Sequence, residues 1–474
     1  MLQMENYISC TVVKTKSQMS LQWVLSFICL TFYACNSEEV IPEIDPDYVL
    51  QGGEATIFSS GPDAFTFPMP HLDAKDFNTH FLADAAFEQQ FISAPAPQFG
   101  GLGPLFNQNS CDRCHTRNGR SSIPQFDGDP NSGLLLRLSM QGVDGFGNPI
   151  PVPGFGGQLQ NKSMVGAKAE GIISFYYKQQ VQKFLDGKTV ILKQPVYSIT
   201  HSYIPFPAGA LISPRNAPPV HGLGLLEAIP ESSVLAKEDV NDLDRDGISG
   251  KANRVWDILK REKVLGRFGW KAEQPTGKQQ AAAAAHNDMG LTNHYFPEEH
   301  CAGQTNCTAG LQKDLDVANT TIDLFAFYFQ TLGVPARRSV NDVDVRRGRF
   351  LFSQAKCNSC HVEKYVTGSF PIKPLEHQTI HPYTDLLLHD MGENLADNRP
   401  AGDATGREWR TPPLWGIGLT QAVNSHAGFM HDGRAATLEE AILWHGGEAQ
   451  RSSEFYKSLA LKDRNALLAF LKSL

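Results

Sequence analysis

Two pentapeptides in this chain share the pattern Cys-x-x-Cys-His. They are Cys111-Asp-Arg-Cys114-His115 and Cys357-Asn-Ser-Cys360-His361. Two thiols at this spacing add to the vinyl groups of a porphyrin, and the adjacent histidine binds the iron, so the pattern is typical of c-type haem attachment. No further CxxC pair stands at zinc-ribbon or zinc-finger spacing from either motif. The sequence therefore predicts two covalently bound c-type haems, with His115 and His361 as proximal iron ligands.

What each haem can do depends on the sixth iron position. A second protein ligand makes an electron-transfer centre, whereas a vacant position can bind peroxide or oxygen. After His115 the next histidine is His201, and the methionines between them are Met140 and Met164. We therefore expect the first haem to be open. The second motif is followed by six candidate histidines, which are His377, His381, His389, His426, His431 and His445.

The N-terminus predicts export. An apolar run from Trp23 to Ala34 has the length of a signal-peptide core and is too short to span a bilayer. A small residue followed by Cys35 and a polar stretch resembles a lipoprotein cleavage site; the alternative is plain cleavage. We predict a lipoprotein-type signal peptide over residues 1–34, lipidation of Cys35, and a location in the periplasm or cell envelope, with the lipid as the membrane anchor.

Composition sets the expected organisation. The chain has 474 residues, enough for two to three domains at about 150 residues each. Its net charge of −8 gives no reason to expect nucleic acid as a partner. We predict a linker or N-terminal extension over 35–70, a first haem domain with insertions over 71–335, and a C-terminal cytochrome c domain over 342–474. The expected fold is mainly α with irregular loops and minor β, built from two cytochrome c-like haem domains.

Two cysteines remain after the haem cysteines, Cys35 and those of the leader are assigned. They are Cys301 and Cys307, with five residues between them. In an oxidising compartment such a pair most simply forms a local disulfide. A redox-active pair is the alternative.

An acidic loop follows the pattern that opens an EF-hand. Asp242, Asp244 and Asp246 stand at alternate positions and Gly247 follows, but Asn253 occupies the twelfth position, where a glutamate is usual. The loop is either a calcium site or a solvated acidic turn.

Several sequence blocks between about 100 and 450 resemble those of a known family. They are Gly103-Pro-Leu-Phe-Asn107, Ser213-Pro-Arg-Asn-Ala-Pro-Pro219, Gly222-Leu-Gly-Leu-Leu-Glu-Ala228, Gly266-Arg-Phe-Gly-Trp-Lys-Ala272, Arg410-Thr-Pro-Pro-Leu414, His431-Asp-Gly-Arg-Ala-Ala-Thr-Leu-Glu-Glu-Ala441 and Leu443-Trp-His-Gly-Gly-Glu448. Together they resemble the di-haem oxidoreductase family, whose members are also labelled peroxidase or thiol oxidoreductase. That family is related to the bacterial di-haem cytochrome c peroxidases.

The resemblance implies the sixth ligand of the second haem. In the related peroxidases this ligand stands fourteen residues after the histidine of the His-Asp-Gly motif, and here that position is His445. The resemblance therefore implies that His361 and His445 bind the second iron from opposite sides. The alternative is that His445 is a surface histidine on a helix.

The resemblance also implies catalytic roles in the first region. Trp270 corresponds to a tryptophan between the haems, Gln280 follows ten residues later, and Asp288 is the next acid. Peroxide cleavage needs a group that takes a proton from one oxygen and returns it to the other, and Asp288 is the candidate. It comes two residues earlier than the family's glutamate and is one methylene shorter. Alternatively, Asp288 ends a helix or binds a metal, and Trp270 is an ordinary core residue.

These features predict an exported di-haem oxidoreductase. It would reduce a peroxide at the first haem with electrons from a small redox donor, a cytochrome or cupredoxin, delivered through the second. One alternative is a di-haem electron-transfer cytochrome without substrate chemistry. Another is a peroxidase-like enzyme that oxidises protein side chains, as a relative of the peroxidases does.

Overall fold

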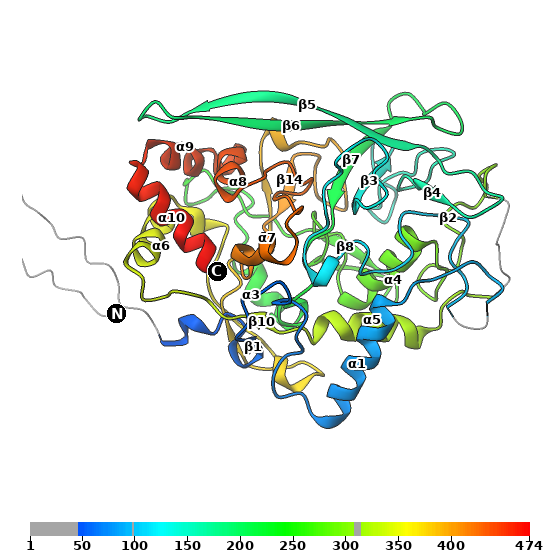
Figure 1. Ribbon diagram of the computed structural model, residues 1–474, viewed down its shortest axis with the longest axis horizontal. Helices are drawn as coiled ribbons and strands as arrows, with labels where there is room; N and C mark the ends of the chain where they lie inside the picture. Colours follow the sequence, from blue (N-terminus) through cyan, green and yellow to red (C-terminus); the bar gives the residue numbers. More distant parts are fainter. Residues whose placement is uncertain (1–45, 97–98, 308–313) are drawn as a thin grey trace, which may run out of the picture. The chain divides into compact units, whose positions relative to one another are not determined.

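The computed structural model describes residues 46–96, 99–307 and 314–474 (Figure 1). The predicted leader and Cys35 lie outside these ranges. Contacts group the described residues into one compact unit. Within the described residues, no helix combines the length and the apolar character needed to cross a membrane.

The described residues contain ten α-helices and fourteen strands. The helices are α1 (Ala74–Glu88), α2 (Leu223–Glu227), α3 (Glu231–Leu235), α4 (Gly277–Met289), α5 (Asn319–Gln330), α6 (Val343–Gln354), α7 (Thr420–Val423), α8 (Leu438–Trp444), α9 (Gln450–Ser458) and α10 (Leu461–Ser473). The strands are β1 (Thr56–Ile57), β2 (Leu105–Phe106), β3 (Leu134–Ser139), β4 (Lys162–Ser163), β5 (Ile172–Lys183), β6 (Thr189–Thr200), β7 (Leu211–Asn216), β8 (Arg254–Asp257), β9 (Glu262–Leu265), β10 (Val334–Pro335), β11 (Tyr365–Val366), β12 (Thr379–Ile380), β13 (Leu388–Asp390) and β14 (Glu408–Arg410).

The expectation of a mainly α fold with two cytochrome c-like domains is wrong. The structure is 28% helical with 19% in strands. Its strands form seven two-stranded sheets in the described part of the chain, which pair β1 with β10, β2 with β4, β3 with β7, β5 with β6, β8 with β9, β11 with β12 and β13 with β14. Frequent glycine and proline end regular elements early, so most of these strands are short.

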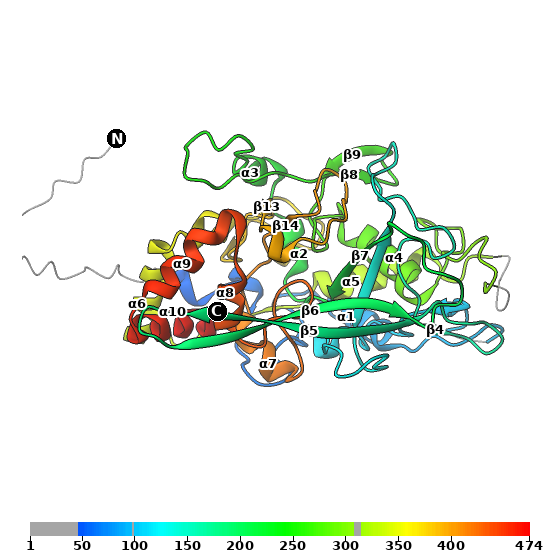
Figure 2. The same ribbon diagram turned by 90° about the horizontal axis from the view of Figure 1, so that it is seen from above.

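The longest sheet is the β5–β6 hairpin, which crosses the upper side of Figure 1 and the front of Figure 2. Its twelve-residue strands pair antiparallel from Ile172 opposite Thr200 to Lys183 opposite Thr189. Alternating aliphatic, aromatic and polar residues favour strands, and Asp186-Gly187 supplies the turn, with Gly187 at φ +86°.

The tip of this hairpin packs onto the C-terminal helices. Phe184 is buried in one cluster with Tyr456 of α9, and the guanidinium of Arg464 in α10 lies 4.2 Å from the Phe184 ring centroid. Lys188 also pairs with Glu439 of α8 at 3.1 Å. Residues from the middle of the sequence therefore complete the core around the second motif.

Helices surround each motif. In the first region α1, α4 and α5 contribute to one apolar cluster, which includes Phe87, Ala285 and Phe325. Beside the second motif, α6 packs against α10. The C-terminal helical segment is divided into α9 and α10, because Leu459 and Ala460 are extended between them.

Side-chain caps start four of the described helices where the sequence places a Thr or Asp, including α1, where Asp73 accepts a hydrogen bond from the Asp76 amide. Thr276 accepts a hydrogen bond from the Gln279 amide at the start of α4, and Thr437 accepts one from Glu440 at the start of α8. Asp342 caps α6 in the same way. Each cap satisfies an amide that has no partner within the helix, and so fixes where the cavity-lining segments begin.

The α6–α10 contact generates a stability prediction. A Cβ on Gly348 would overlap the Ala466 carbonyl oxygen of α10. We expect Gly348→Ala to lower the free energy of unfolding by about 1–3 kcal/mol, because overpacking of this size outweighs the smaller helix preference for alanine. Urea unfolding followed by circular dichroism measures this. Gly61→Ala is the matched control, because a Cβ there meets no atom within 4 Å; equal midpoints for both variants would contradict the prediction.

Candidate haem sites

Both Cys-x-x-Cys-His motifs line one continuous cavity. Four cysteines, both motif histidines and many apolar side chains share its wall. All four sulfurs are free thiols and lie at or near the cavity surface. The residues predicted from sequence that also belong to this wall are Trp270, Gln280, Asp288, His389, His431 and His445. Segments more than 300 residues apart in the sequence thus line the same cavity.

The two motif histidines are held by backbone carbonyls. The Nδ1 of His115 lies 2.8 Å from the Pro218 carbonyl oxygen, and the Nδ1 of His361 lies 2.9 Å from that of Tyr383. A carbonyl only accepts, so each Nδ1 carries the proton and each Nε2 keeps its lone pair, the usual arrangement of a metal-binding histidine. Burial lowers the pKa of both imidazoles to about 4, which keeps them neutral at pH 7.

His445 has the same arrangement. It follows the last residue of α8, and its Nδ1 donates to the Ala441 carbonyl at 2.7 Å. Burial lowers its pKa, and its charge is one of the influences on the pKa of His361. The two imidazoles therefore lie near each other in the same cavity, each with a free Nε2. Ligation of one iron by both remains a prediction.

One face of α4 forms part of the wall. Gln280, Ala284 and Asp288 are spaced four residues apart, so they lie in a row along the helix, and Ala281 adjoins them. Because alanine side chains are small, they leave the cavity open beside this face of α4. Asp288 Oδ1 accepts a hydrogen bond from Gln158 Nε2 at 2.8 Å. Burial raises the pKa of this carboxyl, although the Arg137 charge opposes the shift.

Trp270 lies in the wall with its ring fixed. Its Nε1 donates to the Asn216 carbonyl at 2.8 Å, and the Arg120 guanidinium lies 5.2 Å from the ring centroid. The backbone amide of Arg410 donates to the Trp270 carbonyl at 2.9 Å. The tryptophan is therefore joined to β14, which belongs to the second region.

A second tryptophan, which the sequence reasoning missed, stands beside it. Trp409 stacks on His431 with ring centroids 3.7 Å apart. The Arg215 and Lys271 cations lie 4.5 and 4.7 Å from the Trp409 centroid. Trp409 directly precedes the Arg410 block that carries the family resemblance, and this position was the only signal available in sequence.

A buried ion network supports this part of the wall. Asp397 binds Lys271 Nζ at 2.8 Å and Arg215 at 3.2 Å, and it accepts a hydrogen bond from Ser213 Oγ at 2.5 Å. The Lys271 side chain is 0% exposed and also donates to two backbone carbonyls. The Arg215 and Lys271 charges lower the pKa of Asp397 despite its burial, so the carboxylate stays ionised.

Buried arginines in the wall also escaped the sequence analysis. Arg120 Nε and Arg215 Nη1 are buried and have no hydrogen-bond partner in the described structure. Arg410 donates to the carbonyls of Gly269 and Thr411 at 2.9 and 3.1 Å. Guanidinium groups of this kind suit carboxylates, and a haem carries two propionates. The free arginine atoms, the free imidazole nitrogens and the paired thiols therefore fit two haems.

The two methionines that follow the first motif in the sequence do not line the haem cavity. Met140 packs against the β3–β7 core and Met164 follows β4. Neither belongs to the described cavity wall, whereas Met289, Met391 and Met430 do. Met289 directly follows Asp288, a neighbourhood that the sequence could have indicated.

His389 is unsuited to bind iron. Its Nε2 lies 2.7 Å from Asp385 and its Nδ1 lies 2.7 Å from Glu448. Burial disfavours the charged ring, but the Asp385 carboxylate and its other neighbours raise the pKa of His389 well above the ordinary value. A protonated imidazole has no lone pair for a metal.

The family-like block Gly222–Ala228 includes Glu227 and is preceded by His221, and these two side chains have different surroundings. His221 lines the cavity, stacks on Phe65 at 4.0 Å, and has a buried Nδ1 with no partner among the described residues. Glu227 is outside the wall: it accepts from the Gly277 amide at 3.0 Å and from Gln330 at 2.7 Å. Glu227 therefore stabilises the first turn of α4.

The acidic loop gathers three carboxylates. Oxygens of Asp239, Asp242 and Asp244 lie within 4.8 Å of one another, and Asp239 was not considered from sequence. Asp246 instead accepts from the Ile248 amide at 2.9 Å. Asn253 is buried, and its Nδ2 donates to the Lys271 carbonyl at 2.6 Å. Calcium binding remains a prediction.

Cys301 and Cys307 form a disulfide with their Cα atoms 5.7 Å apart. Both cysteines are buried beside Leu105 of β2. This bond closes the loop that follows α4.

A cavity that contains two Cys-x-x-Cys-His motifs and buried arginines able to bind carboxylates is typical of a haem protein. The family model described as "Di-haem oxidoreductase, putative peroxidase" matches residues 47–474. The chain belongs to this family, and membership implies two haems and an oxidoreductase activity. A search of curated proteins finds no match.

The arrangement of His361 and His445 generates a second prediction. Methionine ligation raises the potential of a c-type haem relative to histidine. We expect His445→Met to raise the midpoint potential of one haem and leave the other unchanged, as measured by spectroelectrochemical titration. His426→Met, at an exposed histidine outside the wall, is the control. An unaltered potential in His445→Met would remove His445 from the ligand set.

Proposed function

We propose that this protein is an exported di-haem c-type oxidoreductase that reduces a peroxide at the first haem with electrons delivered through the second. The observation that carries the proposal is that one cavity wall contains both motifs, Trp270 and the buried Asp288. When bound, the haems would supply redox-active iron at each motif. The four motif cysteines would attach them, and His115, His361 and His445 would bind their irons.

Asp288 is the group that would move protons. Reduction of a peroxide to water or an alcohol consumes two electrons and two protons, and bond cleavage is faster when one group relays a proton between the two oxygens. Gln158 holds Oδ1 of Asp288 at 2.8 Å. Gln280, which the family resemblance also places among the catalytic residues, lies two turns away on the same helix face and in the same wall.

Trp270 would bridge the two redox centres. Its ring belongs to the shared wall, its nitrogen is anchored to Asn216, and its carbonyl is bonded to Arg410. The Trp409–His431 stack belongs to the same wall. A fixed aromatic path of this kind keeps the distance between donor and acceptor constant.

The cellular location, the electron donor and the calcium site are part of the same proposal. The lipid anchor at Cys35 and the periplasmic or cell-envelope location follow from the N-terminal sequence alone. A small cytochrome or cupredoxin is the proposed electron donor, and the Asp242–Asp246 loop is the proposed calcium site.

One observation favours a second candidate, a di-haem electron-transfer cytochrome. Met289 is buried, lies in the cavity wall and is adjacent to Asp288. A thioether bound at the first iron would leave no position for peroxide.

Electron paramagnetic resonance of the oxidised holoprotein separates the two candidates. An open first site gives one high-spin and one low-spin haem, and cyanide converts the high-spin signal to low-spin. Two low-spin haems that do not respond to cyanide would support the cytochrome and reject the peroxidase proposal.

The raised pKa of Asp288 gives a third prediction, on activity and pH. The deprotonated carboxylate is the base, so peroxide turnover should fall as pH drops through the raised pKa, above the ordinary value of about 3.9. Asp288→Asn should lower kcat by about 10²–10⁴-fold and abolish this acid limb. Asp323→Asn, at a half-exposed carboxylate on α5, is the control. Full turnover with an unchanged pH profile in Asp288→Asn would exclude the proposed role.

A further inference from the structure

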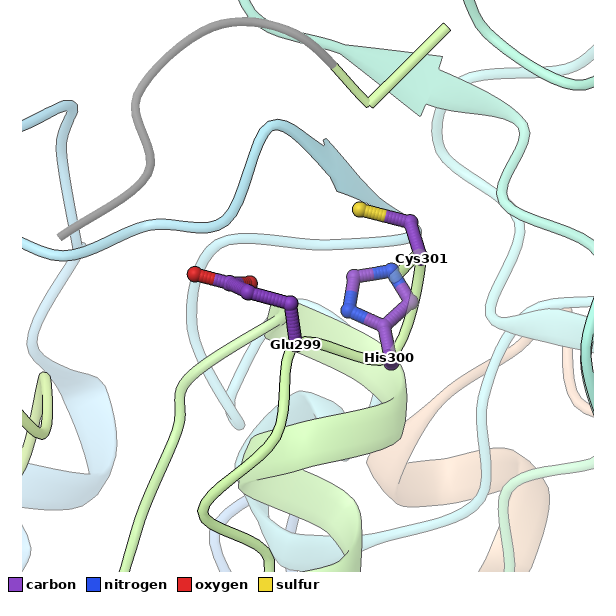
Figure 3. A group of neighbouring side chains, drawn as sticks. All are labelled: Glu299, His300 and Cys301. Atoms are coloured by element: carbon purple, nitrogen blue, oxygen red, sulfur yellow. The ribbon is translucent and has the colours of Figure 1, made fainter. Parts of the chain in front are cut away.

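A second group of chemically capable side chains lies beyond the end of α4. It consists of His286 on the helix and of Glu299 and His300 in the loop that follows. Figure 3 shows Glu299 and His300. His286 precedes Asp288 by two residues, so the two side chains leave the helix in different directions. None of the three residues belongs to the described haem-cavity wall.

These side chains carry buried polar atoms without partners. Both ring nitrogens of His300, Oε2 of Glu299 and Nδ1 of His286 are buried and form no hydrogen bond in the described structure. A buried polar atom without a partner costs about 1–3 kcal/mol. Four such atoms on three neighbouring side chains therefore indicate that a partner is missing from this place.

The geometry suits a metal ion. A carboxylate oxygen of Glu299 and a ring nitrogen of His300 lie within 4.8 Å of each other, and Figure 3 shows the two as neighbouring side chains. The His286 and His300 ring centroids are 5.8 Å apart and the rings are nearly perpendicular. Zinc binds nitrogen and oxygen ligands at about 2.0–2.2 Å, so binding would require the neighbouring His286 ring to turn its Nδ1 toward Glu299 and His300.

His286 is already in the protonation state of a ligand. Its Nε2 lies 2.9 Å from the Glu298 carbonyl oxygen, so Nε2 carries the proton and Nδ1 keeps its lone pair. A metal-binding histidine usually donates its second nitrogen to a carbonyl or carboxylate in this way. The ring also stacks on Phe296 at 5.1 Å, which fixes its direction.

We propose that His286, Glu299 and His300 bind a divalent transition-metal ion, with zinc as the best match. Two imidazoles and one carboxylate are a zinc donor set, whereas calcium and magnesium prefer oxygen ligands alone. Cys301 adjoins the site, but its sulfur is bonded to Cys307 and is not a thiolate. The site therefore has N₂O character, with a fourth position for water.

The ion would join the end of α4 to the disulfide-closed loop. The Asn287 carbonyl in the same helical turn accepts from Gln158 and Gln160 at 3.0 and 2.8 Å, and Gln158 also binds Asp288. A metal held by His286 would restrain this turn and hence the Asp288 carboxyl. Its role is structural, and it does not depend on the proposed peroxide chemistry.

Zinc binding to the disulfide-intact holoprotein tests the site. After treatment with a chelator, the protein is equilibrated with buffered free zinc and its zinc content per chain is measured. We expect one zinc per chain that His300→Ala and His286→Ala bind at least about 10–100-fold more weakly. Glu299→Gln keeps the side-chain shape and should weaken binding by a similar factor without disturbing the fold.

His294→Ala is the matched control, because His294 is an exposed histidine in the same loop; it should bind zinc like the parent protein. The haem absorption spectrum reports whether each variant is folded. The proposal is overturned if the parent binds no zinc at micromolar concentrations. It is equally overturned if folded Glu299→Gln and His300→Ala bind zinc as tightly as the parent.

Discussion

The buried carboxylate of Asp397 is the constraint on which the haem cavity depends. It belongs to the second region of the chain, and its two cationic partners, Lys271 and Arg215, belong to the first. Removal of one member of a buried ion pair costs about 3–5 kcal/mol, because a charge is left without a partner. This network therefore fastens the two motif-bearing regions together and positions Trp270 and Trp409 in one wall.

The same network leaves the cavity with a cationic surface. Glu273 lies 3.6 Å from Arg215 and 3.5 Å from Arg399, so part of the positive charge is neutralised by protein. Arg120 Nε and Arg215 Nη1 remain without protein partners. Burial lowers the pKa of Arg120 only to about 10, so the group stays charged at pH 7. Haem propionates would supply the missing negative charge, which would connect assembly of the wall with haem binding.

Sequence reasoning succeeded where chemistry is local. A Cys-x-x-Cys-His motif is complete within five residues, and the blocks around it were enough to identify the family that matches residues 47–474. Sequence reasoning failed where the paired strands lie far apart in the sequence or must be considered together. The β5–β6 hairpin needs both arms and an Asp-Gly turn to be considered together, and β1 pairs with β10 across 278 positions, from Thr56 to Val334. Short strands of this kind have no periodic signal of their own.

By itself the sequence determined the two haem motifs and the family, because both follow from residue type and local spacing. The candidates Trp270, Gln280, Asp288 and His445 followed from the resemblance to that family. Only the tertiary structure decided that these residues share one cavity. It also decided that His389 is held between two carboxylates, and that His286, Glu299 and His300 meet beyond α4. The physical reason is that burial and charge partners arise from contacts between distant segments, and these contacts set which nitrogen or oxygen remains free to bind.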